Sequence, residues 1–306
     1  MDIFIFIVSM AALIYGADFI IEQSEKIALH YKISSFVIGA TLVALGTSLP
    51  EMAVSMSASM KGSGDIAVAN VIGSTIFNIS LVLGVVFLIA KNVKPTRDLF
   101  AKDSAWSLFP IFAFILMGID GEINFVDGLL FLALMAGYLI FLISSNAMEE
   151  IDEDIAKEKF GWGKTSLLLA VGFIFVVVGA DFAIDSASNI ARSFGISEWV
   201  IGLFLIAFGT SLPELTISIK SALNNNTDLA IGNIIGSNVA NFTMVLGLSS
   251  LINPLNVDLS ANMFDITAAV IVSVMLVFIT ANKLYNKSAG IALMVILALV
   301  VQNSLA

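Results

Sequence analysis

The sequence predicts an all-α polytopic membrane protein with ten transmembrane helices, arranged as two inverted repeats of five helices. Three observations support this fold class. The chain is 58% hydrophobic and only 12% charged, its second half repeats its first, and its basic residues fall almost entirely on one side of the predicted spans. A soluble domain of 306 residues would need more charge to cover its surface, so the long apolar segments indicate membrane spans.

Each expected span follows from length and hydrophobicity, because a helix needs roughly 20 apolar residues to cross a bilayer. The N-terminal segment lacks the basic region of a cleavable signal peptide, so it is interpreted as a retained first span. In chain order the expected spans are residues 2–25, 33–60, 65–90, 103–119, 124–145, 164–190, 196–222, 228–251, 260–281 and 287–304.

The repeat has an offset of 163 residues. The hexapeptide Gly-Thr-Ser-Leu-Pro-Glu occupies residues 46–51 and again 209–214, and the matching register needs no gap from residue 16 to residue 84. The chain is therefore interpreted as a tandem duplication. The expected domains are a first repeat at 1–145 with motif span 33–60 and ligand span 65–90, an acidic linker at 146–163, and a second repeat at 164–306 with motif span 196–222 and ligand span 228–251.

An odd number of spans in each copy predicts that the second copy enters the membrane upside down. Loop charge agrees with this topology, because cytoplasmic loops are normally enriched in Lys and Arg. With both termini outside a cell (inner or plasma) membrane and the acidic linker in the cytoplasm, the outer loops hold only Lys61 and Arg192. The inner loops hold Lys26, Lys32, Lys91, Lys94, Arg97, Lys102, Lys157, Lys159, Lys164, Lys220, Lys283 and Lys287. The linker is expected to be a solvated tether.

The duplicated hexapeptide predicts a cation site. A charged side chain in a span costs at least about 2 kcal/mol and marks function. Proline lacks an N–H, so each motif also frees a backbone carbonyl that must find a partner. All the candidate ligands carry oxygen, which hard cations such as Ca²⁺ and Na⁺ prefer. They are Glu51, Glu214, Thr47, Ser48, Thr210, Ser211, Ser74, Ser237, Asn78 and Asn241.

Other polar residues are expected to have structural roles. The carboxylates outside the motifs are interpreted as helix caps, two asparagines as hydrogen-bonding partners between helices, and the single histidine as a loop residue unsuited to a proton relay. These residues are Asp18, Asp181, Asp65 and Asp228 among the carboxylates, then Asn70 and Asn233, and His30.

Two other functional classes fit the sequence less well than a transporter. An intramembrane hydrolase would need a metal-activated water or a nucleophile–base pair, and no His-containing motif lies in any expected span. A channel would conduct slowly through a site so rich in ligands. The absence of cysteine excludes disulfides and thiolate metal sites. The sequence also lacks the basic stripe that is typical of nucleic-acid-binding proteins.

The paired motifs, together with Gly73–Asn78 and Gly236–Asn241, resemble the alpha-repeats of sodium/calcium exchangers in the calcium/cation antiporter superfamily. The resemblance covers essentially the whole chain. It implies that Glu51 and Glu214 are the main Ca²⁺ ligands, with flanking Na⁺ sites formed by the hydroxyls, and that the carbonyls of Ala44 and Ala207 contribute. It also implies that the first and sixth spans form a gating bundle.

The resemblance further implies exchange of Na⁺ for Ca²⁺ by alternating access, with these ions as substrates, no cofactor and no obligate protein partner. The exchange is expected to be electrogenic. Many prokaryotic and potassium-dependent relatives carry Asp where this chain has Asn241, so transport is expected to be independent of K⁺. Proton-coupled relatives have a different motif, which is absent here. An H⁺/Ca²⁺ antiporter, or an antiporter of another divalent cation, is the alternative.

Overall fold

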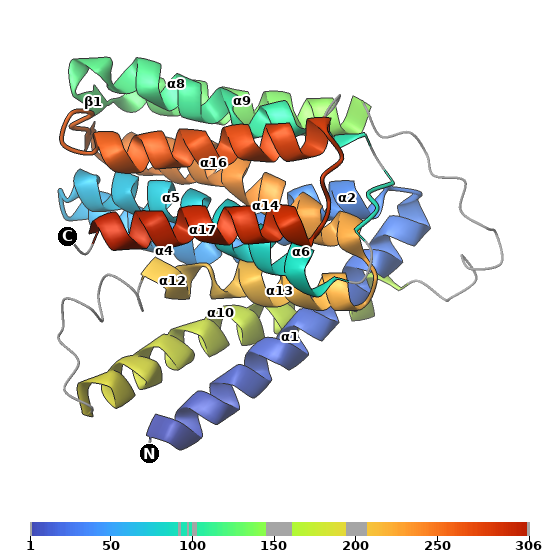
Figure 1. Ribbon diagram of the computed structural model, residues 1–306. Coiled ribbons are helices and arrows are strands. Elements are labelled where there is room, and N and C mark those ends of the chain that lie inside the picture. Colours follow the sequence, from blue (N-terminus) through green and yellow to red (C-terminus); the bar gives the residue numbers. More distant parts are fainter. Residues whose placement is uncertain are drawn as a thin grey trace.

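A computed structural model of the protein describes residues 2–90, 93–96, 98–99, 103–144, 161–193 and 207–304. Most of its helices run roughly parallel to one another, and the helices at residues 2–31 and 162–193 are inclined to the rest (Figure 1). The first half contains α1 (Asp2–Tyr31), α2 (Ser35–Ile38), α3 (Ala44–Thr47), α4 (Leu49–Met60), α5 (Gly64–Phe77), α6 (Gly84–Ile89), α8 (Phe109–Met117) and α9 (Phe125–Ser144). The second contains α10 (Trp162–Ser193), α12 (Ala207–Thr210), α13 (Leu212–Leu223), α14 (Thr227–Ala240), α15 (Leu246–Ile252), α16 (Met263–Ala281) and α17 (Lys287–Ser304).

Within the described residues, six helices are long and apolar enough to cross a membrane, or seven if one bent pair counts as a single span. That pair is Ser35–Thr47 and Leu49–Met60, which meet at 45°. Two shorter apolar helices cover Ser104–Asp120 and Lys287–Asn303. The class of helical membrane protein is thus confirmed, and the count of ten spans stays a prediction.

The central span is α14 with α15, because 94% of its apolar window is buried by other helices. It crosses α2 and the π-helical segment Gly39–Val43 that follows it at very short range. A Cβ added at Gly236 would lie 2.4 Å from the Ala40 carbonyl oxygen, so only glycine allows the two backbones to approach so closely. This crossing brings residues 35–43 of the first copy against α14 of the second copy.

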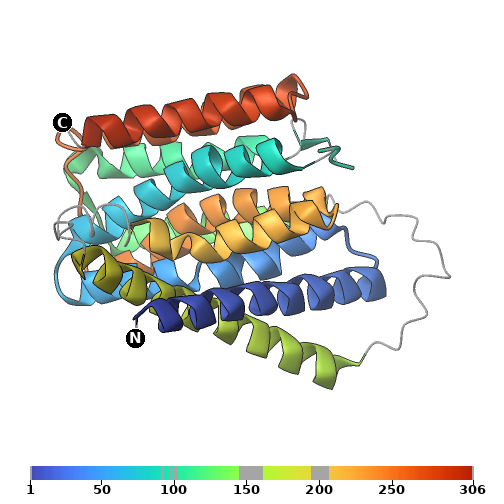
Figure 2. The same ribbon diagram turned by 60° about the horizontal axis from the view of Figure 1, so that its bottom comes forward.

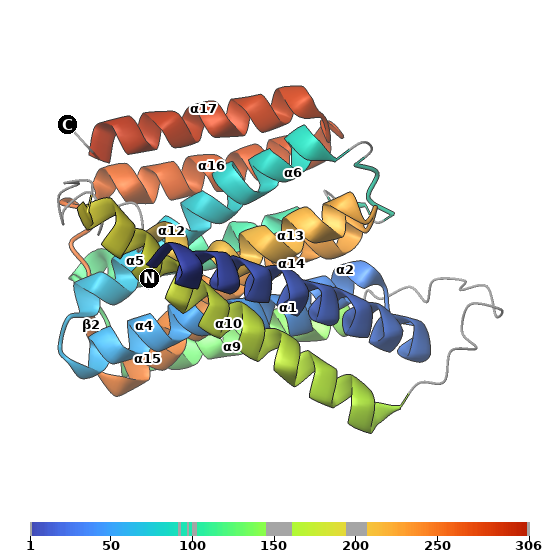
Figure 3. The same ribbon diagram turned by 90° about the horizontal axis from the view of Figure 1, so that it is seen from below.

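Helices α1 and α10 pack against each other at one edge of the molecule, and α17 lies at the opposite edge (Figure 2). Seen from below, the two helices cross (Figure 3). Near one end of this pair, the indole Nε1 of Trp162 donates a hydrogen bond of 2.9 Å to the hydroxyl of Tyr31. The pair is therefore tied together by polar as well as apolar contacts.

Helix α1 is longer than the predicted span 2–25, which corrects two expectations. His30 lies in the last turn of the helix, and the helix ends where Lys32 adopts a left-handed φ of 54°. Hydrophobicity falls after residue 21, but the i,i+4 ion pair between Glu22 and Lys26 (2.7 Å) supports the helical conformation beyond the apolar stretch. A prediction from the length of the apolar segment therefore underestimates the length of this helix.

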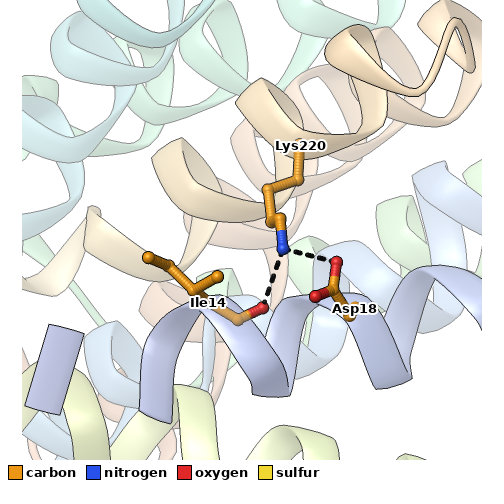
Figure 4. Close-up of polar contacts among 3 residues, drawn as sticks. All are labelled: Ile14, Asp18 and Lys220. Atoms are coloured by element: carbon orange, nitrogen blue, oxygen red, sulfur yellow. Dashed lines mark hydrogen bonds and ion pairs between the residues drawn. The ribbon is translucent and has the colours of Figure 1, made fainter. Parts of the chain in front are cut away.

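Asp18 and Asp181 do not cap helices either, because both lie well inside α1 and α10. The Asp18 carboxylate instead accepts from the ammonium group of Lys220 on α13, with Nζ to Oδ1 at 2.5 Å (Figure 4). The same ammonium donates to the Ile14 carbonyl at 3.2 Å. Asp18 therefore joins α1 to the second copy of the repeat.

Asp228 is not the N-cap of its helix, because the side chain of Asn226 takes that role by accepting from the Leu229 amide. The Asp228 carboxylate binds the distant Thr96 instead, through its amide at 3.1 Å and its hydroxyl at 2.8 Å. In the first copy, Asp65 lies in the first turn of α5, and Ser63 is the N-cap. The aspartates thus lie two residues past the position expected for capping.

Three further features differ from the sequence expectation. The segment predicted as the span 103–119 is α8 flanked by 3₁₀ turns at Ser104–Ser107 and Gly118–Asp120. Two short strands, β1 (Glu122–Ile123) and β2 (Leu255–Asn256), pair antiparallel and join distant loops. Helix α10 begins at Trp162, inside the predicted linker, while residues 145–160 and 194–206 lie outside the described part of the chain.

Candidate cation site

Each hexapeptide interrupts its helix at the serine. Ser48 has φ −81° and ψ 7°, and its counterpart Ser211 has φ −88° and ψ 5°, so neither residue is helical. Helices α4 and α13 begin at the next residue, with a proline in the first turn, where the missing N–H removes no helical bond. The helix is therefore interrupted beside the proline in both copies.

This break places both glutamates in the first turn of a helix, where the partial positive charge of free amide groups favours an anion. Both side chains have no exposed surface, and in each the Oε2 atom has no hydrogen-bond partner among the described residues. The two carboxylates also interact electrostatically with each other. Two buried carboxylates with free oxygens, which interact with each other and have no basic partner in the described part of the chain, are suited to hold a cation.

Hydroxyl groups surround the two carboxylates, and several come from the opposite copy of the repeat. Ser74 lies 3.5 Å from Glu51, and its counterpart Ser237 lies 3.5 Å from Glu214, both measured between Oγ and Oε1. Across the copies, Ser48 donates to Glu214 at 3.3 Å. The hydroxyl of Thr210 likewise reaches Glu51. Each carboxylate is therefore contacted by both halves of the chain.

The Thr47 side chain lies at a junction of several acceptors. Its Oγ1 is 3.1 Å from the Ala44 carbonyl, 3.2 Å from the amide oxygen of Asn233 and 3.3 Å from the hydroxyl of Ser237. The Ala44 carbonyl is also within 3.5 Å of that same serine hydroxyl. A hydroxyl has one proton, so these oxygens cannot all be satisfied at once and some remain free to accept from or bind another group.

Asn70 and Asn233 form the interhelical hydrogen bonds that the sequence predicts. Asn70 donates to Ser55 at 3.0 Å and to the backbone carbonyl of Glu51 at 3.2 Å. In the second copy, Asn233 donates to Ser218 at 3.1 Å. Because Ser218 is the repeat counterpart of Ser55, the same hydrogen bond joins α4 to α5 in the first copy and α13 to α14 in the second.

The predicted ligands Asn78 and Asn241 are both fully buried, and each begins a π-helical segment, Asn78–Leu83 and Asn241–Val245. Such wide turns are common at functional sites. Asn78 donates to the amide oxygen of Asn238 at 3.2 Å. Sequence reasoning missed Asn238, because its counterpart in the first copy is Thr75 and a search for identical pairs passes over it.

The structure shows fewer contacts for the remaining predicted ligands, Ser211, Ala44 and Ala207. Ser211 is 1% exposed and its Oγ has no partner among the described residues, unlike the equivalent Ser48. Ala44 lies buried within the first motif helix, and Ala207 begins α12 directly after the segment 194–206 that is not described. No group of three or more His, Cys, Asp or Glu side chains that could hold a metal occurs among the described residues, so neutral oxygens must supply most ligands of the paired site.

The fold and the site together define a polytopic membrane transporter for cations. Comparison with known proteins names the family: the sequence model described as "Sodium/calcium exchanger protein" matches residues 1–144 and 164–305. The chain belongs to the sodium/calcium exchanger family. This is a family of transporters, not of enzymes.

Individual relatives agree over nearly the full length. An uncharacterized membrane protein of Methanocaldococcus jannaschii is 38% identical over 286 residues, which cover 94% of this chain and 92% of the relative. The sodium/calcium exchanger MaX1 of Methanosarcina acetivorans is 29% identical, with 95% and 94% covered. A solved structure of the sodium-calcium exchanger NCX_Mj, soaked with Na⁺ and without Ca²⁺, superposes with a TM-score of 0.86 at 36% identity and covers 98% of both chains.

Proposed function

We propose that this protein is an antiporter that exchanges Na⁺ for Ca²⁺ across the membrane by alternating access. The observation that carries the proposal is the pair Glu51 and Glu214, fully buried, electrostatically coupled and each left with an unpartnered oxygen. The names of the relatives, sodium/calcium exchanger MaX1 and the structure of a sodium-calcium exchanger, support the choice of ions.

The chemistry of the site explains how two different cations can compete for it. One Ca²⁺ neutralises both carboxylates and takes about six to eight oxygen ligands, which hydroxyls, amide oxygens and carbonyls can supply. Two or three Na⁺ ions can share the same oxygens. The empty site carries two negative charges in a low dielectric and should resist the change of access. Exchange is therefore favoured over leakage, and it is electrogenic if three Na⁺ move for each Ca²⁺.

The proposed ligands are the residues predicted from the sequence, with the glutamates central and the flanking hydroxyls, amides and carbonyls completing the shell. The asparagine at position 241 carries no charge, so the centre holds two carboxylates and has less to offer an additional monovalent cation. We expect transport to be independent of K⁺ for this reason.

The proposed topology has ten spans in two inverted five-helix repeats, 1–145 and 164–306, with both termini outside and the linker 146–163 in the cytoplasm. The recurrence of the Asn70–Ser55 bond as Asn233–Ser218 supports two equivalent halves. The distribution of Lys and Arg supports the orientation. Inverted repeats that meet at a central site are the usual construction of secondary transporters.

The test is calcium uptake into proteoliposomes that contain the purified protein. Lumenal Na⁺ diluted into Na⁺-free buffer should drive radioactive Ca²⁺ inward, with and without K⁺, and a K⁺-selective ionophore should reveal the net charge moved. Glu51→Gln should abolish uptake, because it removes one of two charges that balance Ca²⁺. Glu122→Gln, at an exposed glutamate on β1, is the matched control and should transport like the native protein.

The alternative is proton-coupled exchange of Ca²⁺ or another divalent cation. Uptake driven equally well by a pH gradient in the absence of Na⁺ would contradict the sodium proposal and favour this alternative. A requirement for K⁺ in the native protein would contradict the argument from Asn241. Mn²⁺ accepts similar ligands and should be included as a competitor.

A further inference from the structure

We infer that Asn238 is a positioning residue, which holds the Asn78 side chain so that its amide oxygen Oδ1, and not its amide NH₂ group, is presented to the cation. This inference rests on the proposed function, because it concerns how one of the proposed ligands is oriented. It adds a residue that is not a ligand itself.

The geometry is a hydrogen bond between two buried amides from different copies of the repeat. Asn78, with no exposed surface, donates its Nδ2 to Oδ1 of Asn238, which is 2% exposed, at 3.2 Å. After this bond is made, the Oδ1 of Asn78 has no partner among the described residues. The free atom of Asn78 is thus the oxygen, which is the only atom of an amide that can bind a cation.

Such a contact matters because the two ends of an asparagine side chain are almost the same size. A half-turn of the amide replaces an oxygen with an NH₂ group, which repels a cation. Packing alone cannot distinguish these two orientations, whereas a hydrogen bond to an acceptor oxygen can. The Nδ2 of Asn238 itself has no partner among the described residues, so the contact with Asn78 is the hydrogen bond that its side-chain oxygen accepts. Asn238 supplies that acceptor from α14, on the opposite side of the junction between the two copies.

Among the residues that the structure describes, the second copy has no equivalent contact. Its ligand candidate Asn241 has neither amide atom paired among the described residues. The position that matches Asn238 in the first copy is Thr75, whose buried hydroxyl also has no partner there. The two asparagines of the site are therefore not interchangeable: Asn78 is fixed with its oxygen free, and Asn241 is not.

A double-mutant cycle tests this role through Na⁺-driven Ca²⁺ uptake. Asn238→Leu preserves the approximate volume of the side chain and removes the acceptor, so the Ca²⁺ concentration for half-maximal uptake should rise about three- to tenfold, as expected for loss of one hydrogen bond, with little change in maximal rate. In Asn78→Asp both ends of the side chain are oxygens. Adding Asn238→Leu to that variant should then change the half-maximal concentration less than about twofold.

Two further variants separate positioning from packing. Asn238→Asp keeps an acceptor and should not raise the half-maximal concentration, whereas Thr75→Val, at the equivalent position, should behave like the native protein. The inference is overturned if Asn238→Leu leaves the half-maximal concentration unchanged, or raises it by the same factor with Asn78 and with Asp at that position. If Asn238→Leu does not fold, a rise in Asn238→Asp overturns it instead. Failure of the proposed function is distinct, because the native protein itself would then show no Na⁺-driven uptake.

Discussion

At the scale of single residues, the first glycine of the motif has a role that the sequence did not indicate. Gly46 lies four residues before Pro50, so its carbonyl is the one that the proline cannot bond. The structure adds a packing reason, because a Cβ at Gly46 would lie only 1.9 Å from Cε1 of Phe173 on α10. This glycine therefore sets how closely α10 approaches α3, the helix that contains Gly46.

Gly46→Ala is expected to reduce both thermal stability and transport, because either the Phe173 ring or α10 must move to make room. Replacing the ring as well, in Gly46→Ala with Phe173→Ala, should restore part of the lost Tm. Gly137→Ala on α9 is the control, since its new Cβ would meet nothing closer than 3.9 Å, and alanine favours a helix by up to about 1 kcal/mol. A Gly46→Ala protein as stable and active as the native one would contradict this packing argument.

The sequence could predict many residues of the candidate site, but not every member of it and not which side chains contact one another. The glutamates, hydroxyls and Asn78 are recognisable because they recur at one offset in an apolar context. Asn238 breaks the repeat and is found only when its distance to Asn78 is measured. The pairing of Ser48 with Glu214 is equally hidden, because the sequence does not state which hydroxyl reaches which carboxylate.

At the scale of helices, the breaks were predictable and the ends were not. Proline at position 50 or 213 has a fixed local consequence, and the helix does restart there in both copies. The end of α1 depends on charged residues that continue the helix past its apolar part. The π-helical segments were not predicted either; each contains a hydroxyl, that of Ser80 or Thr243, which donates to the carbonyl four residues back.

The contact between α1 and α13 leads to a prediction at this scale. Lys220→Ser, which introduces the residue found at the equivalent position 57, removes the ion pair with Asp18 and the bond to Ile14. Because the Asp18 side chain is 45% exposed, the expected loss of stability is at most about 1 kcal/mol and should shrink at high salt.

The measurement is Tm in detergent at low and high NaCl, with Lys287→Ser as the control. Lys287 is exposed in the first turn of α17 and should contribute little. A Lys220→Ser protein with unchanged Tm at low salt would show that this ion pair does not hold the two helices together.

At the scale of the whole molecule, the repeat is visible in backbone conformation as well as in sequence. The turn after α4 contains Gly62 with φ 73°, and the turn after α13 contains Asn225, its counterpart, with φ 62°. Gly and Asn are the residues that best tolerate this left-handed conformation. The two connections therefore have the same shape, and inverted topology predicts that they face opposite sides of the membrane.

Because the chain contains no cysteine, single-cysteine variants can test this topology directly. Lys61→Cys and Asn224→Cys occupy equivalent positions at the ends of α4 and α13. In intact cells, a membrane-impermeant maleimide should label the first and not the second, and inside-out vesicles should reverse the result. Labelling of both variants from the same side would exclude inverted repeats, while the cysteine-free native chain reports the background.

The hydrogen bonds around the glutamates divide into two kinds, and the division has a consequence for energy coupling. Bonds such as Asn70–Ser55 stay within one copy, whereas Ser48–Glu214 and Thr47–Asn233 connect the copies. Any movement of one copy against the other must therefore change the hydrogen bonds of the residues that we propose as cation ligands. Binding energy and conformational equilibrium are then linked at a single location, so the coupling requires no relay through distant residues.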